Sequence, residues 1–320
     1  MSAAWWLGVV VVAVGCTPPD GSNRWSKEPS NTGEDLRAVH AWARNRVLAV
    51  GTNARTVANV DGQWRERNLQ SQDTLTSLWG VDDTDVFIVG GLEGNPGHGI
   101  AWRTTTGFFT YNAMALPLGT DMLRSVHGTS AQDVWAVGDN NTAVHFDGTR
   151  WLPSPIPSPT NLGGIHFNAV WCRSDVACWA VGTAGMVARW NGSQWTVTAD
   201  DTLGRTLRAL HGTDSFVLAV GDDGAILREE AATPGVMSPE GAPSGQRDLL
   251  AVWSAASDNS WAMGAVEDSS YAVVLRVDGT TDWVESDKPR SDYAIRSIHG
   301  LARDLAWAVG DRGTIFRLGN

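Results

Sequence analysis

The chain repeats one short phrase seven times. The phrase reads loosely Leu-x-Ala-Val-Trp-Gly, then five or six polar residues, then Asp-Val-Trp-Ala-Val-Gly. Its closing glycines stand 39 to 48 residues apart, at Gly51, Gly90, Gly138, Gly182, Gly221, Gly264 and Gly310. A period of that length, with four short strand-like segments in each copy, is typical of a β-propeller. The repeat therefore predicts an all-β, seven-bladed β-propeller with four-stranded blades.

The third copy shows how one repeat becomes one blade. Strand-like segments cover 123–128, 133–138 and 142–146, and an Asp147-Gly148 turn leads into a fourth segment at Trp151. Asp-Gly between two β-rich segments is a strong hairpin signal, because glycine accepts a positive φ without steric cost. The second segment is apolar almost throughout, which predicts a strand covered on both faces by neighbouring blades.

The seventh copy is incomplete and its missing part stands at the other end of the chain. After Arg317 there is no Asp-Gly turn and no tryptophan, whereas Asp20-Gly21 and Trp25 form a copy of that turn and strand before the first repeat. We expect residues 20–30 to complete blade seven and close the ring, which removes two exposed sheet edges. The predicted organisation is a leader at 1–16 and one propeller at 17–320, with blade repeats that start near residues 36, 75, 123, 167, 207, 249 and 295.

The first sixteen residues are of another kind. An eight-residue apolar run, Leu7 to Val14, suits the core of a signal peptide and is too short to span a bilayer. It ends in Ala13-Val14-Gly15-Cys16, which resembles a bacterial lipobox, although Ala13 stands where leucine is usual and no Lys or Arg precedes Trp6. The resemblance implies lipidation at Cys16 and a bacterial cell-envelope location, at the outer membrane or cell surface. The alternative is a hydrophobic start with an incidental cysteine.

Net charge limits the partners. The chain carries a formal charge of −11, and a nucleic-acid partner normally requires a basic stripe. Adsorption to anionic lipid through surface charge is disfavoured for the same reason. We expect a monomer that meets the membrane only through its lipid anchor.

Most of the 17 tryptophans recur in register. Recurrence at fixed repeat positions favours core packing between blades over carbohydrate binding. Trp42 lies outside the register and is the candidate for an exposed role. The three recurring positions are occupied by Trp25, Trp64, Trp151, Trp195 and Trp283; by Trp135, Trp179, Trp261 and Trp307; and by Trp79, Trp171 and Trp253.

Four histidines share the last of these positions: His40, His127, His211 and His299. A metal site is one interpretation. Equivalent positions on packed sheets are expected about 10 Å apart, whereas zinc requires each nitrogen about 2 Å from one point. A packing role is therefore favoured, and no metal is predicted.

Cys172 and Cys178 flank the turn between the first two strands of blade four. Residues on either side of a hairpin can reach bridging geometry, and export would allow oxidation, so a disulfide is predicted; two free thiols are the alternative. No catalytic motif or cofactor fingerprint is present. The acid pairs Asp82-Asp83, Asp200-Asp201 and Asp222-Asp223 are expected to be solvated turn caps. No cofactor and no catalytic residue are predicted.

The Asp-Gly-x-x-Trp turn is similar to a degenerate Asp-box of sialidase-like propellers. The wider phrase, including Cys172 to Gly182, resembles bacterial repeat lipoproteins with Trp-Ala-Val-Gly motifs and photosystem II stability-factor propellers. These resemblances cover residues 20 to 320 and imply a fold rather than an activity. Sialidases also use an arginine triad and a tyrosine with a glutamate, and no triad can be assigned here to accompany Tyr111, Tyr271 or Tyr293.

Irregular loops remain as the place for a binding site. The long excursions are expected to join second to third strands, or one blade to the next, and hence to share one face of the ring. They span residues 91–98, 109–122, 152–166, 229–247 and 285–294. The function predicted is a non-enzymatic surface lipoprotein that binds or scaffolds an envelope protein or glycan; the alternative is an Asp-box-type glycoside hydrolase or lyase. A concave acid–arginine–tyrosine cluster on this face favours the enzyme, and a flat, mixed polar face favours the binder.

Overall fold

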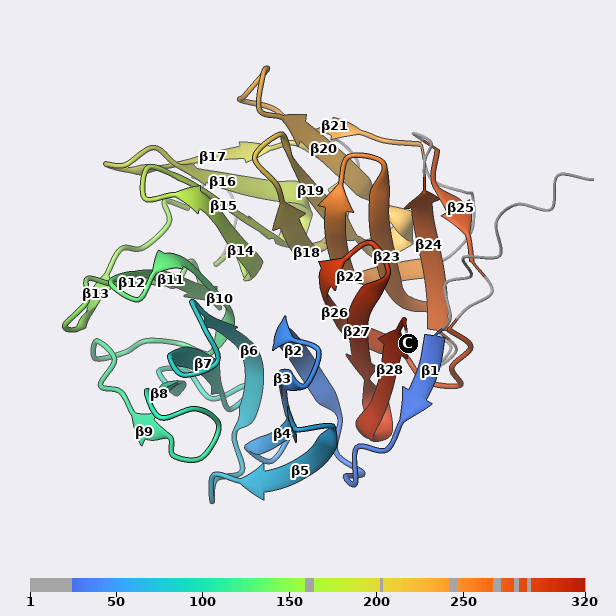
Figure 1. The fold of residues 1–320 in the computed structure, drawn as a ribbon. Coiled ribbons are helices and arrows are strands. Elements are labelled where there is room, and N and C mark those ends of the chain that lie inside the picture. Colours follow the sequence, from blue (N-terminus) through green and yellow to red (C-terminus); the bar gives the residue numbers. More distant parts are fainter. Residues whose placement is uncertain are drawn as a thin grey trace, which may run out of the picture.

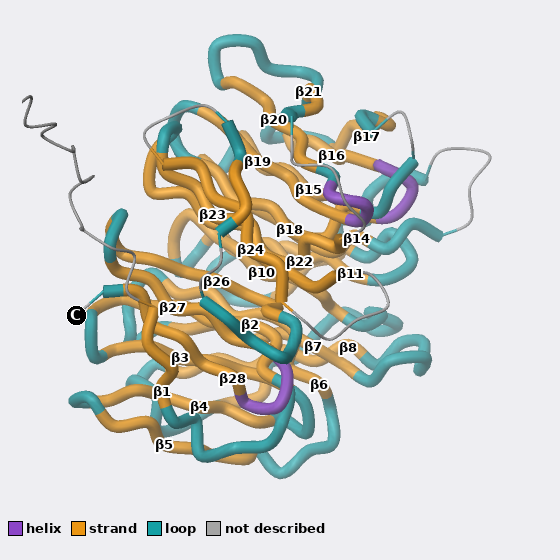
Figure 2. Tube along the Cα trace, turned by 90° about the vertical axis from the view of Figure 1, so that its right-hand side faces the viewer, coloured by secondary structure: helices purple, strands orange, loops and turns teal. Residues whose placement is uncertain are grey.

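The computed structural model describes residues 25–158, 164–201, 204–241, 247–266, 272–278, 282–286 and 289–319. Seven four-stranded antiparallel sheets surround a common centre, as Figure 1 shows. The predicted seven-bladed propeller is confirmed. In a view at right angles, the strands run between two loop-bearing sides of the disc (Figure 2).

The blades follow one another along the chain, and in the first six blades the strands run in chain order from the innermost to the outermost. Blade one contains β2 (Leu36–Ala43), β3 (Arg46–Gly51), β4 (Arg55–Val60) and β5 (Gln63–Asn68). Blade two contains β6 (Thr74–Gly80), β7 (Val86–Gly91), β8 (Gly99–Thr104) and β9 (Asn112–Ala113). Blade three contains β10 (Leu123–Ser130), β11 (Asp133–Gly138), β12 (Ala143–Phe146) and β13 (Trp151–Pro153).

The remaining blades repeat this plan, with three short 3-10 turns between second and third strands. Blade four contains β14 (Phe167–Ser174), β15 (Ala177–Gly182), η1 (Thr183–Gly185), β16 (Met186–Trp190) and β17 (Trp195–Ala199). Blade five contains β18 (Leu207–Gly212), β19 (Phe216–Gly221), η2 (Asp222–Gly224), β20 (Ile226–Glu230) and β21 (Ser238–Pro239). Blade six contains β22 (Arg247–Ala256), β23 (Asn259–Val266), β24 (Ala272–Asp278) and β25 (Val284–Glu285). Blade seven contains β26 (Ile295–Ala302), β27 (Leu305–Gly310), η3 (Asp311–Gly313), β28 (Thr314–Leu318) and β1 (Trp25–Glu28).

The N-terminal strand closes the ring, as predicted. β1 pairs antiparallel with β28, with Trp25 opposite Leu318 and Glu28 opposite Ile315; Figure 1 shows the blue β1 beside the red β28. The Glu28 carboxylate accepts a hydrogen bond from Trp64 Nε1 at 2.6 Å and lies 3.1 Å from Arg317 Nε. Because Trp64 belongs to blade one, this carboxylate ties the closing strand to the next blade as well as to its own.

Large side chains between the blades form the core. Eleven of the twelve aligned tryptophans are at most 8% exposed, and half-buried Trp25 packs edge-on against Trp261. The second strands are almost fully buried, as their apolar sequences predict; every residue of β7 and β19 is buried. The core-packing interpretation of the aligned tryptophans is therefore confirmed.

Blades two and five depart from the repeat in their outer strands. β9 and β21 are only two residues long, and β21 was not recognised from sequence. Phe108 (3% exposed) and Met237 (1% exposed) are buried beside these strands, where other blades use tryptophan. Smaller apolar side chains thus replace the aromatic wedge.

The disc has two faces with different connections. The mouth face carries the turns from second to third strands and the connections between blades; the opposite face carries the other two sets of hairpin turns. Two predicted excursions do not lie on the mouth face alone. Because β9 and β21 interrupt them, residues 105–111 and 231–237 are third-to-fourth connections on the opposite face. In the described part of the chain, no helix has the length and apolar character needed to cross a membrane.

Candidate functional site

The innermost strand of every blade carries a β-bulge near its start. In each pairing of first with second strand the register shifts across one residue, for example between Leu36 and Ala38. A bulge re-aims the side chain of the extra residue. The seven bulged residues are Arg37, Thr76, Arg124, Asn168, Arg208, Leu250 and Arg296, and they line one cavity of about 240 Å³ on the mouth face.

Four of these seven side chains are arginines, and each binds an aspartate. Arg296 donates from Nε and Nη2 to Asp311 at 2.6 and 2.8 Å. Arg124 and Arg208 bind in the same two-pronged way to Asp139 and Asp222. Arg37 donates from Nη2 to Asp35 at 3.3 Å. Paired guanidinium and carboxylate groups fix the direction of each arginine.

The aspartates come from a turn that the repeat encodes. Asp139, Asp222 and Asp311 each follow the closing glycine of the phrase, in a tight turn whose next two residues have positive φ. In blade one Thr52 takes that place, so Arg37 pairs with Asp35 from the connection between blades. Burial is the largest single effect on the pKa of Arg296 and lowers it, but the hydrogen bond to Asp311 together with the charges of Asp311 and Asp35 makes the net shift of that pKa upward.

Each arginine keeps donors for a ligand. The aspartates occupy Nε and Nη2 in three of the four, and within the described residues Nη1 of Arg124, Arg208 and Arg296 has no protein hydrogen-bond partner. Between 29% and 40% of each arginine side chain is exposed. The mouth therefore offers directed N–H groups to solvent, although the whole chain is strongly acidic.

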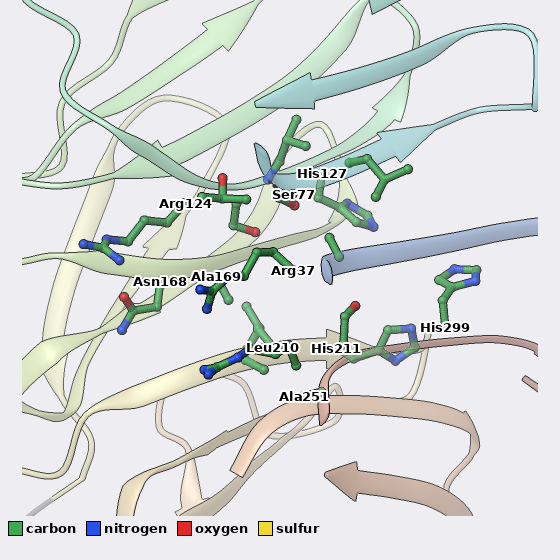
Figure 3. A pocket seen from close by; sticks show the side chains of 18 of the residues that line it. Arg37, Ser77, Arg124, His127, Asn168, Ala169, Leu210, His211, Ala251 and His299 are labelled. Atoms are coloured by element: carbon green, nitrogen blue, oxygen red, sulfur yellow. Dashed lines mark hydrogen bonds between the residues drawn. The ribbon is translucent and has the colours of Figure 1, made fainter. Parts of the chain in front are cut away.

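Below the arginines, the channel narrows to a ring of aromatic side chains. In blade order this ring reads His40, Trp79, His127, Trp171, His211, Trp253 and His299. A cavity of about 270 Å³ runs from the arginines to the four histidines; Figure 3 shows arginines at one end of this pocket and histidines at the other. Arginine and histidine occur together in blades one, three, five and seven.

The expected 10 Å spacing between equivalent histidines is wrong for one pair. The rings of His40 and His299 stack with centroids 3.9 Å apart. First strands converge on the channel, so their side chains approach more closely than those of parallel stacked sheets. Within the described residues, no group of three or more His, Cys, Asp or Glu side chains is arranged to hold a metal ion.

Three of the histidines accept hydrogen bonds from the next blade. Nδ1 of His127, His211 and His299 accepts the backbone N–H of Cys172, Ser254 and Ala41 at 3.1, 3.3 and 3.2 Å. An accepting Nδ1 requires the hydrogen of the neutral ring to be on Nε2.

The channel keeps its histidines neutral. Burial, reinforced by the neighbouring histidines, lowers the pKa of His127 and His299 to about 3. Burial alone lowers the pKa of His211 to about 4. Burial, reinforced by the other three histidines, lowers the pKa of His40 well below its usual value. The four rings are therefore uncharged near neutral pH.

Each channel tryptophan covers a glycine of the next blade. A Cβ at Gly212 would lie 2.6 Å from the Trp171 ring, and Gly300 has the same relation to Trp253 at 2.5 Å. In blade one this position is Ala41, and the ring of the preceding blade is His299 rather than a tryptophan. The smaller histidine ring leaves room for the alanine methyl group. The frequent His-Gly pair of the repeat therefore reflects the tryptophan of the preceding blade.

The residues singled out from sequence lie in different parts of the molecule. Cys172 and Cys178 stand opposite one another on β14 and β15 and form the predicted disulfide. Trp25 lies on the closing strand, and Cys16 is outside the described residues.

Two further predictions about named residues were wrong. Trp42 is half-buried between blades one and two, where Nε1 donates to the Gly80 carbonyl at 3.0 Å, because the first strand extends past the channel. Asp200 and Asp201 are 7% and 3% exposed and bind Arg189 and Arg205, so this acid pair is buried in ion pairs rather than solvated.

The arginine mouth was not recognised from sequence. Its signal is the four-residue pattern Arg-x-x-His in alternate repeats, together with an aspartate after the closing glycine in three of those repeats. Only the bulge shows that this arginine turns toward the channel.

Comparisons with known proteins agree on the fold. No family model matches the chain. A segment of 97 residues is 31% identical to immune protein Tsi7 of Pseudomonas aeruginosa, and this match spans 29% of the chain and 30% of that protein. The structure is similar to virginiamycin B lyase from Staphylococcus aureus, at a TM-score of 0.77 and 15% identity over 93% of this chain and 99% of that one. It is also similar to YCF48 bound to D1 peptide, at a TM-score of 0.71 and 15% identity over 92% of this chain and 95% of that one. At such identity the likeness to the solved structures establishes the β-propeller fold alone.

Proposed function

We propose that this chain is a non-enzymatic binding propeller that captures an anionic segment of an envelope protein or glycan at the mouth of its central channel. The observation that carries the proposal is the convergence of Arg37, Arg124, Arg208 and Arg296 on one opening, each from one of the seven equivalent bulges. Guanidinium groups are well suited to carboxylate and phosphate ligands, because several N–H donors lie in one plane.

The paired aspartates determine how the mouth would attract a ligand. Each neutralises most of the charge of its arginine, so binding depends on directed Nη1 hydrogen bonds more than on a positive field. Glu93 also lines the mouth cavity, so the directed arginine donors rather than the net charge of the mouth would select the ligand. A peptide bound to a propeller of the same fold, in the YCF48 structure, also supports a binding role.

Export and lipid anchoring belong to the same proposal. The apolar run that ends at Cys16 and the Cys172–Cys178 disulfide both fit a protein exported to an oxidising compartment. Partitioning of the wild type and of Cys16→Ala between detergent and aqueous phases tests the anchor: the wild type should enter detergent and the variant should not. Equal aqueous partitioning of both would contradict it.

Fluorescence anisotropy with labelled hexaglutamate tests the mouth. We expect Arg124→Gln and Arg208→Gln each to weaken binding about tenfold, the effect of losing one charge-assisted hydrogen bond. Arg303→Gln is the matched control, because Arg303 also pairs with an aspartate, Asp258, but lies on the opposite face and is 51% exposed. Equal losses in all three variants would contradict a site at the mouth.

No converging set of side chains of this kind supports the alternative, a glycoside hydrolase or lyase, among the described residues. Over the described residues, neither the mouth nor the channel is lined by a tyrosine. Tyr111 packs between blades one and two, Tyr293 lies against Arg312, and Tyr271 is outside the described residues. The Asp-box-like turns cap themselves: the Thr149 hydroxyl and two backbone N–H groups bind Asp147 and lower its pKa to about 2.

A further inference from the structure

We propose that the channel below the arginines holds a second site, which binds one oxyanion group, a carboxylate or a phosphate, through serine hydroxyls and histidine N–H groups. The inference deepens the proposed function and rests on it in one respect: a segment held at the mouth could place its terminal carboxylate here. Three features of the channel support it.

The first feature is a set of three serines whose hydroxyl oxygens each already accept one hydrogen bond. Ser77, Ser125 and Ser297 lie two residues before the channel ring position. Their Oγ atoms accept the backbone N–H of Val126, Val170 and Val39 at 3.1, 3.1 and 3.2 Å. A hydroxyl that accepts from the next blade retains its own hydrogen as a donor, and all three serines line the channel cavity.

The second feature is the matching arrangement of the histidines. Nδ1 of His127, His211 and His299 is likewise occupied by a backbone N–H of the next blade, which leaves Nε2–H as the donor of each ring. Within the described residues, these Nε2 atoms have no protein hydrogen-bond partner. Inter-blade hydrogen bonds thus occupy the acceptor of each histidine and one lone pair of each serine, and leave N–H and O–H donors at two successive levels of the channel.

The third feature is the absence of competing acids. Among the described residues, the lining of the channel cavity includes four arginines and four histidines but no aspartate or glutamate. The aspartates that pair with the arginines stand outside this lining. The cavity, at about 270 Å³, is far larger than the roughly 30 Å³ of one water molecule, so it can admit a carboxylate or phosphate with its bound water.

An acceptor-rich ligand is the chemical complement of such a lining. The serine and histidine donors are partly exposed to the cavity, and an oxyanion offers several lone pairs that can accept from hydroxyl and imidazole donors together. The four arginines that line the same cavity would add further N–H donors. An apolar or ammonium group of the same size offers no acceptor and would leave these donors unsatisfied.

Histidine side-chain NMR of the purified protein, titrated with inorganic phosphate, tests the site directly. We expect phosphate to shift the Nε2 resonances of the channel histidines. The triple variant Ser77→Ala, Ser125→Ala, Ser297→Ala should weaken phosphate binding at least tenfold. The other four blades carry Ala38, Ala169, Ala209 and Ala251 at this position, so the fold accepts alanine there.

Two forms of hexaglutamate identify the source of the oxyanion. A free C-terminal carboxylate that binds at least tenfold more tightly than the C-terminal amide supports entry of a chain end. Phosphate shifts without that preference support a site for a free oxyanion.

The proposal is overturned when phosphate leaves the histidine resonances unmoved and the two peptides bind equally. Hexaglutamate binding that still depends on the mouth arginines would then leave the proposed function intact. Phosphate shifts without any peptide binding would refute the proposed function and support the inner site.

Discussion

Replacement of His211 by asparagine should reduce the acid sensitivity of the fold. Burial lowers the pKa of His211 to about 4, whereas histidine in the unfolded chain titrates near 6.5. Between these values the unfolded state binds more protons than the folded state, so stability is complete above about pH 6.5 and falls as the pH is lowered toward 4. For this one group, linkage gives a loss of about 2 kcal/mol between pH 7.5 and pH 5.0.

Asparagine is the appropriate replacement because it separates titration from hydrogen bonding. Its Oδ1 can take the place of Nδ1 and accept the Ser254 N–H, yet it does not titrate. We expect both proteins to be stable at pH 7.5. At pH 5.0 His211→Asn should have lost about 2 kcal/mol less of its free energy of unfolding than the wild type, because the other three channel histidines still titrate in both.

Urea unfolding followed by tryptophan fluorescence at the two pH values measures the difference. The wild type should show a lower midpoint at pH 5.0 with an unchanged slope, since the surface exposed on unfolding is the same. Equal losses in the two proteins would refute the reasoning. They would mean that His211 takes up its proton in the folded channel without cost.

Three further predictions concern packing and closure. Gly212→Ala should cost about 1–3 kcal/mol in urea unfolding, because the new methyl group meets the Trp171 ring at 2.6 Å, and adding Trp171→His should recover part of that cost; an additive double variant would contradict the contact. Replacing Cys172 and Cys178 together by serine should lower the free energy of unfolding by about 2 kcal/mol, which is the loop entropy that a disulfide with a six-residue separation removes from the unfolded chain. Reducing agent should lower the urea midpoint of the wild type and leave that of the double variant unchanged. Glu28→Ala should cost about 2 kcal/mol through the lost contacts with Trp64 and Arg317, whereas Lys27→Ala on the same strand, which is exposed, should change stability by less than about 0.5 kcal/mol; similar effects of both would argue against the closure contact.

Features carried by local pattern could be predicted from the sequence. The blade count follows from the phrase, the closing strand from the displaced copy around Trp25, and the disulfide from cysteines that flank one hairpin. In each case the residues that interact are placed by strand pairing within one blade. The outer strand of blade five was not predicted, because buried Met237 takes the place of the tryptophan that marks this strand in other blades.

The candidate site depends on relations between blades and was therefore missed. Nothing in the residues around Arg37 or Arg124 indicates that a bulge turns them toward the channel, and the same letters on a regular strand would point elsewhere. The contact between His40 and His299 likewise depends on convergence at the centre, which the spacing of stacked sheets does not describe. Asp200 is buried because Arg189 reaches it and Glu229 of the next blade, a contact between distant segments.

The ring at the centre of the channel alternates two kinds of side chain around seven positions. Strict alternation is impossible on a ring with an odd number of members, so two like residues must meet once; here they are His40 of blade one and His299 of blade seven. Blade seven is also the blade that the two ends of the chain complete together. The inner strand of blade seven thus carries one of the two adjacent histidines, and its outer strand, β1, comes from the other end of the chain. Separation of blade seven from blade one would therefore break the His40–His299 stack at the centre and the Glu28–Trp64 hydrogen bond at the rim together.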